Sequence, residues 1–330
     1  MRAPSFWWRD AGIAAGLLAP FAAAYGRIAA ARLGRPGVAL GVPVLCIGNL
    51  TIGGAGKTPT ALAAARILAT AGERPAFLSR GYGGRLAGPV QVDPRRHSAN
   101  DVGDEPLLLA RAAPTIVARD RVAGAQAAIA AGGTVIVMDD GFQNPSLCKD
   151  AALLVIDGRR GVGNGSVIPA GPLRAPLAPQ LARADAILVI GEPSGATAVL
   201  AAARRRSMRI FQGRLTPDPA AVAALRGRKV LAFAGIADPD KFFATLAVAG
   251  IEAPIRRAFP DHHGYTLAET AGLVADAARH GLLPVTTEKD FVRLSGALAA
   301  QAQVLPVTVG VDDPDDFRRF VLGVAPVRAP

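Results

Sequence analysis

A glycine-rich run ending in Gly-Lys-Thr has the composition of a loop that binds phosphate groups. It spans residues 51–58 and reads Thr51, Ile52, Gly53, Gly54, Ala55, Gly56, Lys57 and Thr58. The glycines allow backbone N–H groups to close around phosphate oxygens. The Lys57 ammonium can reach the terminal phosphates of a nucleotide, and the Thr58 hydroxyl can bind Mg²⁺. We therefore predict a nucleotide site here, although Thr51 stands where the usual pattern begins with glycine.

The segments on either side of this run have the structure that such a loop needs. The apolar residues 42–47 predict a buried strand, and residues 59–71 predict a helix with Pro59 in its first turn. The N-terminus of that helix adds a partial positive charge. The alternative is a glycine-rich turn that only joins strand to helix, and the flanks together with Gly-Lys-Thr make it much the weaker interpretation.

Polar residues follow two further predicted strands, at the sheet edge where open parallel sheets bind ligands. Asp139 and Asp140 end the apolar run 135–138, and either carboxylate could hold Mg²⁺ directly or through water. A pair of exposed turn acids is the alternative. Arg80 and Tyr82 lie in a glycine-rich turn after another strand, where they could supply polar contacts to a ligand, although such a turn can also be purely structural.

Three other segments carry candidate side chains. Asp104 precedes a helical stretch, so on its own it is best interpreted as a helix N-cap. Residues 157–165 and 169–174 form a long loop after a strand, and loops of this length are often functional. His262 lies in a turn between a strand and a helix, where a histidine is usually just solvated.

Short apolar runs alternate with alanine-rich helical stretches, which predicts an α/β fold with a mainly parallel sheet covered on both faces. The expected strands of a P-loop core cover residues 42–47, 75–78, 115–117, 135–138, 153–156 and 186–190. After about residue 209 the pattern restarts and predicts a second, smaller α/β lobe. Its expected strands cover residues 230–234, 253–259, 284–286 and 304–309, with helices at 239–249, 267–279 and 314–322.

Four units follow from this pattern. We expect an N-terminal membrane-interface helix in residues 1–35, a P-loop core in residues 36–209, a hinge in residues 210–225 and the smaller lobe in residues 226–330.

Two cysteines in or near apolar runs, Cys46 and Cys148, predict buried free thiols and a reducing compartment. The sequence has no Cys/His cluster of the kind that binds structural zinc.

The charge of the chain limits its partners. There are 37 basic and 26 acidic residues, a net charge of +11. The basic residues are scattered, with one short run at residues 204–206, and they do not alternate with aromatic residues as in proteins that stack bases. We therefore expect an anionic membrane surface as partner and no nucleic acid; nothing in the pattern sets an oligomeric state.

The N-terminal segment has the composition of a helix that lies in a lipid interface. Trp7 and Trp8 stand beside Arg9, and residues 11–25 carry no charge, which is short of the roughly 20 residues of a spanning helix. Ile13, Leu17, Phe21, Tyr25 and Ile28 fall on one helical stripe, followed by Arg27, Arg32 and Arg35. A signal peptide, a single spanning helix and a helix of the soluble core are the alternatives.

Taken together, these motifs resemble one family, the tetraacyldisaccharide 4′-kinases of lipid A synthesis. The matching strings are TIGGAGKT, SRGYGG, VGDEP, VMDDGFQ, DGRRGVGNG, PAGPLR, FPDHHGYT and TTEKD, over about residues 45–295. Two positions depart from the family pattern. Asn144 stands where histidine is common, and Ala175 where glutamate is usual, which affects local loop or headgroup contacts.

The resemblance implies transfer of the ATP γ-phosphate to the 4′-hydroxyl of a tetraacyl glucosamine disaccharide 1-phosphate, the lipid A precursor, with Mg²⁺ as the metal. It implies a P-loop core joined to the smaller lobe by a β-ribbon, at the cytoplasmic face of the inner membrane. It assigns acceptance of the hydroxyl proton to Asp104 paired with His262, beside Lys57. Arg80, Tyr82, Asn164 and Arg174 are the expected substrate contacts.

Two other classes compete with this interpretation. A regulatory P-loop GTPase selects guanine with Asn-Lys-x-Asp, which Glu288-Lys289-Asp290-Phe291 does not supply. A basic nucleic-acid-binding ATPase would bind DNA with a steep salt dependence. Because P-loop folds host many functions, the fold does not decide among these classes.

Overall fold

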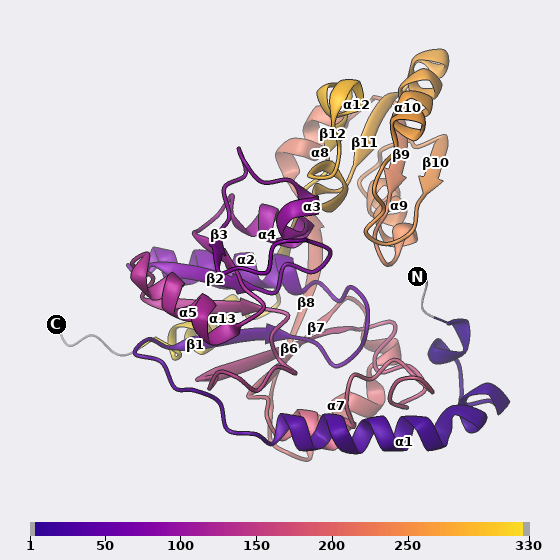
Figure 1. The fold of residues 1–330 in the computed structure, drawn as a ribbon. Coiled ribbons are helices and arrows are strands. Elements are labelled where there is room, and N and C mark those ends of the chain that lie inside the picture. The colour runs from indigo at the N-terminus through magenta and orange to yellow at the C-terminus, as the bar shows by residue number, and fades with distance from the viewer. Residues whose placement is uncertain (1–3, 326–330) are drawn as a thin grey trace.

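The apolar runs of the sequence form neighbouring strands of one large sheet in the computed structural model, which describes residues 4–325 (Figure 1). Within those residues the strand order is β13-β8-β7-β6-β1-β5-β2-β4-β3, and only the two edge pairs are antiparallel. The strands are β1 (Val44–Gly48), β2 (Pro75–Ser79), β3 (Val90–Gln91), β4 (Thr115–Val117), β5 (Val135–Asp139), β6 (Ala151–Asp157), β7 (Ala186–Ile190), β8 (Arg209–Pro217) and β13 (Val307–Val311).

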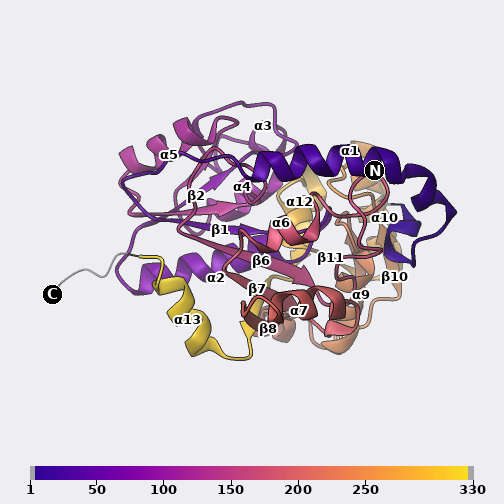
Figure 2. The same ribbon diagram turned by 90° about the horizontal axis from the view of Figure 1, so that it is seen from below.

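Helices cover both faces of this sheet because its central strands are apolar on both faces. In β1, Leu45 and Ile47 pack in a cluster with α2 (Lys57–Thr70) and α13 (Pro314–Leu322). Val44 and Cys46 point to the other face, which carries α1, α5, α6 and α7; Figures 1 and 2 show α1 and α7 on that side. The remaining bounds of this part are α1 (Ile13–Leu33), α3 (Ala99–Val102), α4 (Asp104–Leu109), α5 (Arg121–Ala130), α6 (Leu177–Leu181), α7 (Thr197–Arg204), η1 (Ser5–Trp8) and η2 (Pro193–Gly195).

A second, parallel sheet of order β10-β9-β11-β12 forms a separate layer. One face packs on α9 through Phe242, Phe243 and Leu246, and the other packs on α10 and α12. Its elements are α8 (Pro219–Leu225), β9 (Val230–Ala234), α9 (Pro239–Val248), β10 (Ile255–Ala258), α10 (Leu267–His280), β11 (Leu283–Thr286), α11 (Glu288–Phe291), α12 (Gly296–Gln301) and β12 (Gln303–Val304). We call residues 218–306 the smaller lobe, and the large sheet with its helices the larger lobe.

The link between the lobes differs from the predicted hinge and boundary. Strand β8 covers residues 209–217 of the large sheet, so it includes residues 210–217, which were expected to begin the hinge. The run 304–309, expected as one strand, is interrupted at Pro306 and gives β12 in one sheet and β13 in the other, because proline donates no ladder hydrogen bond. β13 then pairs with β8, and α13 packs on α2, so residues 307–322 belong to the larger lobe. Of the four predicted units, residues 1–3 and 326–330 lie outside the described residues.

The N-terminal helix presents its predicted apolar stripe to the outside. Ile13 is 86% exposed, and Leu17, Phe21, Tyr25 and Ile28 are also exposed, whereas the opposite face buries Ala15, Ala22 and Gly26. At 21 residues, α1 is longer than its charge-free segment suggested and is, among the described helices, the one long and apolar enough to cross a membrane. A helix of the soluble core would not expose this stripe.

Three side chains, those of Trp7, Trp8 and Cys148, lie elsewhere than expected. Trp7, expected among lipids, is buried in the protein, and its indole N–H donates to the Pro169 carbonyl at 3.0 Å. Trp8 lies under the Arg160 guanidinium, 5.1 Å from the ring centre. Cys46 is buried as expected, but Cys148 is exposed.

Candidate active site

The glycine-rich run forms a loop between β1 and α2, at the carboxyl edge of the large sheet. Gly53 and Gly56 have φ values of 116° and 94°, a region that residues with a Cβ rarely adopt. Thr51 instead lies in an extended bridge with Leu173, and Ile52 N–H donates to the Pro172 carbonyl at 2.9 Å. This explains the departure from the usual pattern, since an extended position does not require glycine.

A buried carboxylate without a full set of partners lies beside the first turn of α2. The Thr58 hydroxyl donates to Oδ2 of Asp139 at 3.2 Å, because β5 pairs with β1 and ends level with the loop. Oδ1 of Asp139 is buried and has no hydrogen-bond partner among the described residues. Burial raises the pKa of Asp139 to about 7, and the Lys57 charge offsets this only in part. A hydroxyl and an unsatisfied buried carboxylate oxygen fit a divalent cation.

Asp140 has a different environment from its neighbour. Arg174 donates to its two oxygens at 2.9 and 3.1 Å, and Lys57 lies 3.8 Å away. Partial burial would raise the pKa of Asp140, but these two cations outweigh it and hold the pKa at about 2. Asp140 also has a φ of 56°, a strained conformation for a residue other than glycine, and such strain is concentrated at functional sites.

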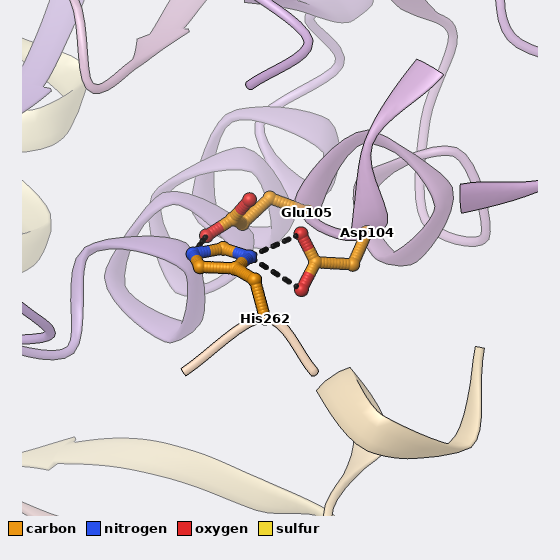
Figure 3. A group of neighbouring side chains, drawn as sticks. All are labelled: Asp104, Glu105 and His262. Atoms are coloured by element: carbon orange, nitrogen blue, oxygen red, sulfur yellow. Dashed lines mark hydrogen bonds and ion pairs between the residues drawn. The ribbon is translucent and has the colours of Figure 1, made fainter. Parts of the chain in front are cut away.

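Asp104 and His262, 158 residues apart in the chain, meet where the smaller lobe contacts the larger one. Nδ1 of His262 lies 3.1 Å from both oxygens of Asp104, and Figure 3 shows the imidazole between Asp104 and Glu105. Asp104 is the first residue of α4 and makes no side-chain cap, so the N-cap interpretation is wrong. The hydrogen bond to Asp104 raises the pKa of His262. His262 also has a φ of 56°.

Two cations of the smaller lobe contact the same acidic pair. Arg293 donates to Oδ2 of Asp104 from Nε at 3.1 Å and Nη2 at 2.7 Å, and Lys289 donates to Glu105 at 2.5 Å. Burial alone would raise the pKa of Asp104, but the bond to His262 and the charges of Lys289 and Arg293 hold it well below its usual range. The two carboxylates are thus balanced by two cations, so this cluster does not require a metal ion.

The smaller lobe also contacts the phosphate loop and a second edge of the larger lobe. A Cβ added to Gly54 would lie 3.8 Å from the Cβ of Ala237, in ordinary van der Waals contact. At the second edge Lys241 of α9 pairs with Asp157, and Arg159 and Arg160 pair with Asp238 at 2.5 and 3.0 Å. The lobes are therefore held together by ion pairs on two sides of the loop.

The four expected substrate contacts fall into two groups. Tyr82 is 67% exposed and its ring lies 5.4 Å from the His262 ring, while Arg80 is exposed just after β2. Arg174 is instead engaged with Asp140 and with the Thr51 carbonyl at 3.1 Å. The Asn164 amide donates to the Ala170 carbonyl at 2.8 Å and accepts from Ser166 N–H at 3.0 Å, within its own loop.

The two departures from the family pattern are accommodated locally. Asn144 accepts from the Ser146 N–H and hydroxyl at 2.8 and 2.6 Å and so closes its own turn. Ala175 is fully buried, and its carbonyl accepts from Gln180 at 2.6 Å. A small apolar side chain suits that enclosed position.

Sequence reasoning did not assign roles to Glu105, Lys289 and Arg293. Lys289 belongs to the string TTEKD after β11, and its position at a strand end was a usable signal. Arg293 lies beyond that string, and an isolated arginine after a short helix carries no comparable signal.

Comparisons with known proteins identify the family of this chain. The family model described as tetraacyldisaccharide-1-P 4'-kinase matches residues 14–325. Tetraacyldisaccharide 4'-kinase of Rhodopseudomonas palustris (strain BisB18) is 57% identical over 98% of this chain and 95% of its own length. The enzyme of the same name from Methylobacterium sp. (strain 4-46) is 60% identical over 96% of this chain and 95% of its own length.

A solved structure, LpxK from Aquifex aeolicus in complex with ATP, aligns with a TM-score of 0.74 at 26% identity and covers 94% of this chain and 99% of that one. The predicted α/β fold and the resemblance drawn from the motifs are thereby confirmed. The chain belongs to the tetraacyldisaccharide-1-P 4'-kinase family.

Proposed function

We propose that this protein transfers the γ-phosphate of ATP to the 4′-hydroxyl of a tetraacyl glucosamine disaccharide 1-phosphate, a lipid A precursor. The observation that carries the proposal is the meeting of Asp104 and His262 across the two lobes, at helix α4, which packs against the phosphate-loop helix α2. A phosphate loop alone would fit many NTPases. An acid–imidazole pair next to it adds the proton acceptor that a hydroxyl substrate needs. Family membership favours this kinase over a GTPase or a nucleic-acid-binding ATPase.

The larger lobe holds the nucleotide in this proposal. Backbone N–H groups of residues 53–58 and the Lys57 ammonium bind the phosphates, aided by the N-terminus of α2. Thr58 and Asp139 are the residues that would hold Mg²⁺, which supplies neutralisation of charge on the phosphates when bound. Asp139 is favoured over Asp140 because its Oδ1 has no hydrogen-bond partner within residues 4–325, whereas Asp140 is engaged by Arg174 and Lys57. Asp140 then fixes these two cations beside the nucleotide.

The Asp104–His262 pair accepts the proton of the sugar hydroxyl as its oxygen attacks the γ-phosphorus and the bond to the β-phosphate oxygen breaks. Asp104 is 3% exposed and His262 is 27% exposed, so the imidazole is the more accessible member. The two side chains lie within 3.1 Å and are expected to act as one unit that shares the proton. The proton then leaves to solvent after ADP and the lipid product depart.

Tyr82 and Arg80 are the proposed contacts to the acceptor lipid headgroup. Tyr82 supports this role because its exposed ring lies beside His262, where the 4′-hydroxyl must approach. Arg174 and Asn164 are assigned a supporting role, since Arg174 orients Asp140 and Asn164 closes the loop 164–170.

A lipid substrate with several acyl chains requires an enzyme at the membrane. We propose that the exposed stripe of α1 inserts into the lipid interface at the cytoplasmic face of the inner membrane, where ATP is present. Arg27, Arg32 and Arg35 are exposed along and just beyond the helix and would contact anionic headgroups, at about 1 kcal/mol each. The buried Trp7 holds the N-terminal segment against the loop that contains Pro169.

The proposed function is tested by incubating purified protein with γ-labelled ATP, Mg²⁺ and the tetraacyl disaccharide 1-phosphate in detergent micelles. We expect label in the lipid at the 4′ position and ADP in equal amount. Omitting the lipid should leave little ATP turnover, and a disaccharide that lacks the 4′-hydroxyl should accept no label. ATP turnover without lipid labelling, or stimulation by nucleic acid, would contradict the assignment.

A further inference from the structure

Arg293 presents a rigid guanidinium to Asp104 from the opposite lobe. Its Nη1 donates to the carbonyls of Gly235 and His263, at 3.2 and 3.3 Å, and to Oδ1 of Asp290 at 3.3 Å, all within the smaller lobe. Nε and Nη2 remain, and both donate to Oδ2 of Asp104. The side chain is 6% exposed.

Asp290 holds this arrangement in place inside the smaller lobe. It is fully buried and accepts from Gly235 N–H and from the Tyr265 hydroxyl, each at 2.8 Å. Its second oxygen accepts from the Thr287 hydroxyl at 2.6 Å. Arg293 is thus paired and oriented by its own lobe, and its contact with Asp104 is not needed to neutralise it. A group that is oriented in advance can fix a partner with little entropic cost.

The two oxygens of Asp104 therefore have different partners. Both lie in reach of the His262 imidazole, but Oδ2 also accepts two hydrogen bonds from Arg293. Among the described residues, Oδ1 accepts no hydrogen bond from Lys or Arg. A planar, two-pronged donor fixes the rotation of a carboxylate more tightly than a point charge does. Without it, the carboxylate could rotate away from the imidazole.

We propose that Arg293 is a positioning residue for the phosphoryl transfer, fixing Asp104 against His262 only when the smaller lobe is closed on the larger one. This inference rests on the proposed function. Because Arg293 and His262 both belong to the smaller lobe, the same contact between the lobes assembles and orients the pair.

The groups that face Asp104 determine how it responds to pH. They are His262, Lys289 and Arg293 from the smaller lobe and Glu105 from its own helix, with Asp261 beyond the imidazole at 3.8 Å. Removing Arg293 takes away one cation and leaves the carboxylate buried. The pKa values of Asp104 and of His262 should then both rise, because a cation that favours the ionised carboxylate and disfavours the imidazolium has been removed.

The test compares Arg293→Met and Arg293→Lys with a control, Lys241→Met, which removes an ion pair between the same lobes at the second edge. We expect Arg293→Met to lower kcat by about 10²-fold with little change in KM for ATP, and to move the acid limb of kcat to higher pH. Arg293→Lys should keep the acid limb of kcat near its wild-type position but should recover only part of kcat. Lysine keeps the positive charge, but it lacks the planar pair of donors that fixes the carboxylate. Lys241→Met should leave the acid limb in place.

An independent readout needs no lipid, so it separates failure of this inference from failure of the proposed function. The chain has 4 histidines, so the imidazole C–H signals can be assigned by NMR and titrated. The pKa of His262 should rise in Arg293→Met and stay near the wild-type value in Arg293→Lys. A fall of that pKa in both variants, or an acid limb that moves equally in Lys241→Met, would mean that Arg293 is only a contact between the lobes, and would overturn the proposal.

Discussion

Replacing Asp104 by asparagine should affect both catalysis and the closed arrangement of the lobes, because this carboxylate is the shared partner of His262 and Arg293. Asparagine keeps the shape and removes the charge. The loss of a proton acceptor should lower kcat by about 10²–10⁴-fold with little change in ATP binding. His262→Ala should act similarly, and the double variant should cost much less than the product of the two single effects.

The cost in stability can be estimated from the contacts. Asp104 accepts two bonds from Arg293 and one from His262, and its side chain is 3% exposed. Breaking one side of a buried pair costs about 3–5 kcal/mol when the remaining charge is left alone. Here Arg293 keeps Asp290 as a partner, so we expect about 3 kcal/mol, the lower end of that range.

This cost should depend on pH in a defined way. The pKa of Asp104 is lowered, so its contribution is present above the ordinary value of 3.8 and is lost as the pH falls further. The pKa of His262 is raised, so its contribution is complete below 6.5 and is lost as the pH rises through the higher, folded-state value. The difference between wild type and Asp104→Asn should therefore be largest between about pH 4 and 6.5 and smaller at pH 9.

Denaturant unfolding at several pH values, combined with single-turnover kinetics, measures both effects on the same samples. A kcat within tenfold of wild type would remove Asp104 from the chemistry. A stability difference that does not change with pH would mean that the carboxylate and the imidazole are not paired in solution. Fully multiplicative effects in the double variant would show that the two side chains act separately.

Three further predictions concern the phosphate loop, the metal corner and the membrane helix. Lys57→Ala should abolish phosphoryl transfer in a protein with unchanged circular dichroism, because a charge on the transferring phosphate is lost; normal turnover would exclude the loop from the mechanism. Asp139→Asn should stabilise the metal-free protein at pH 8 by up to about 4 kcal/mol, because folding raises the pKa of this carboxyl from 3.8 to about 7 and so disfavours its ionised form. Mg²⁺ should then stabilise wild type but not the variant. The double variant Leu17→Ser and Phe21→Ser should dissociate from lipid vesicles and show a higher KM for lipid, with its affinity for ATP unchanged. Loss of ATP binding would mean that α1 supports the fold of the nucleotide site.

The glycine-rich loop that we propose as the nucleotide site could be predicted from the sequence because its chemistry is local. Gly53 and Gly56 adopt backbone conformations that favour glycine, and the strand and helix around them give the expected periodicity. Asp139 was placed correctly beside the loop because parallel strands end at one edge of a sheet. The proposed preference for Asp139 over Asp140 depends on Arg174, which reaches Asp140 from a loop 34 residues further along the chain, and no sequence pattern encodes that contact.

The contacts between the lobes were least accessible. Tertiary packing places residues 307–322 in the larger lobe. The sequence pattern of an apolar strand followed by an amphipathic helix is the same whichever lobe it belongs to. Trp7 reads as an interfacial anchor by composition, yet its N–H finds a carbonyl inside the protein. Asp104 resembled a helix cap because local sequence gives no sign of its partners, His262 and Arg293, which lie 158 and 189 residues further along the chain.

The distribution of charged side chains between the two lobes provides a way for this enzyme to limit the hydrolysis of ATP by water. The larger lobe holds the nucleotide loop and Asp104, but His262, Lys289 and Arg293 all belong to the smaller lobe. With the lobes apart, Asp104 would be a solvated carboxylate without its imidazole and without the guanidinium that fixes it, and therefore a poorly oriented base. Contact of the smaller lobe brings all three side chains at once and places Ala237 against the phosphate loop, which reduces access of water to that loop. An acceptor lipid that occupies the space beside Tyr82 and His262 would favour this closed arrangement, so completion of the base would follow binding of the hydroxyl that it serves.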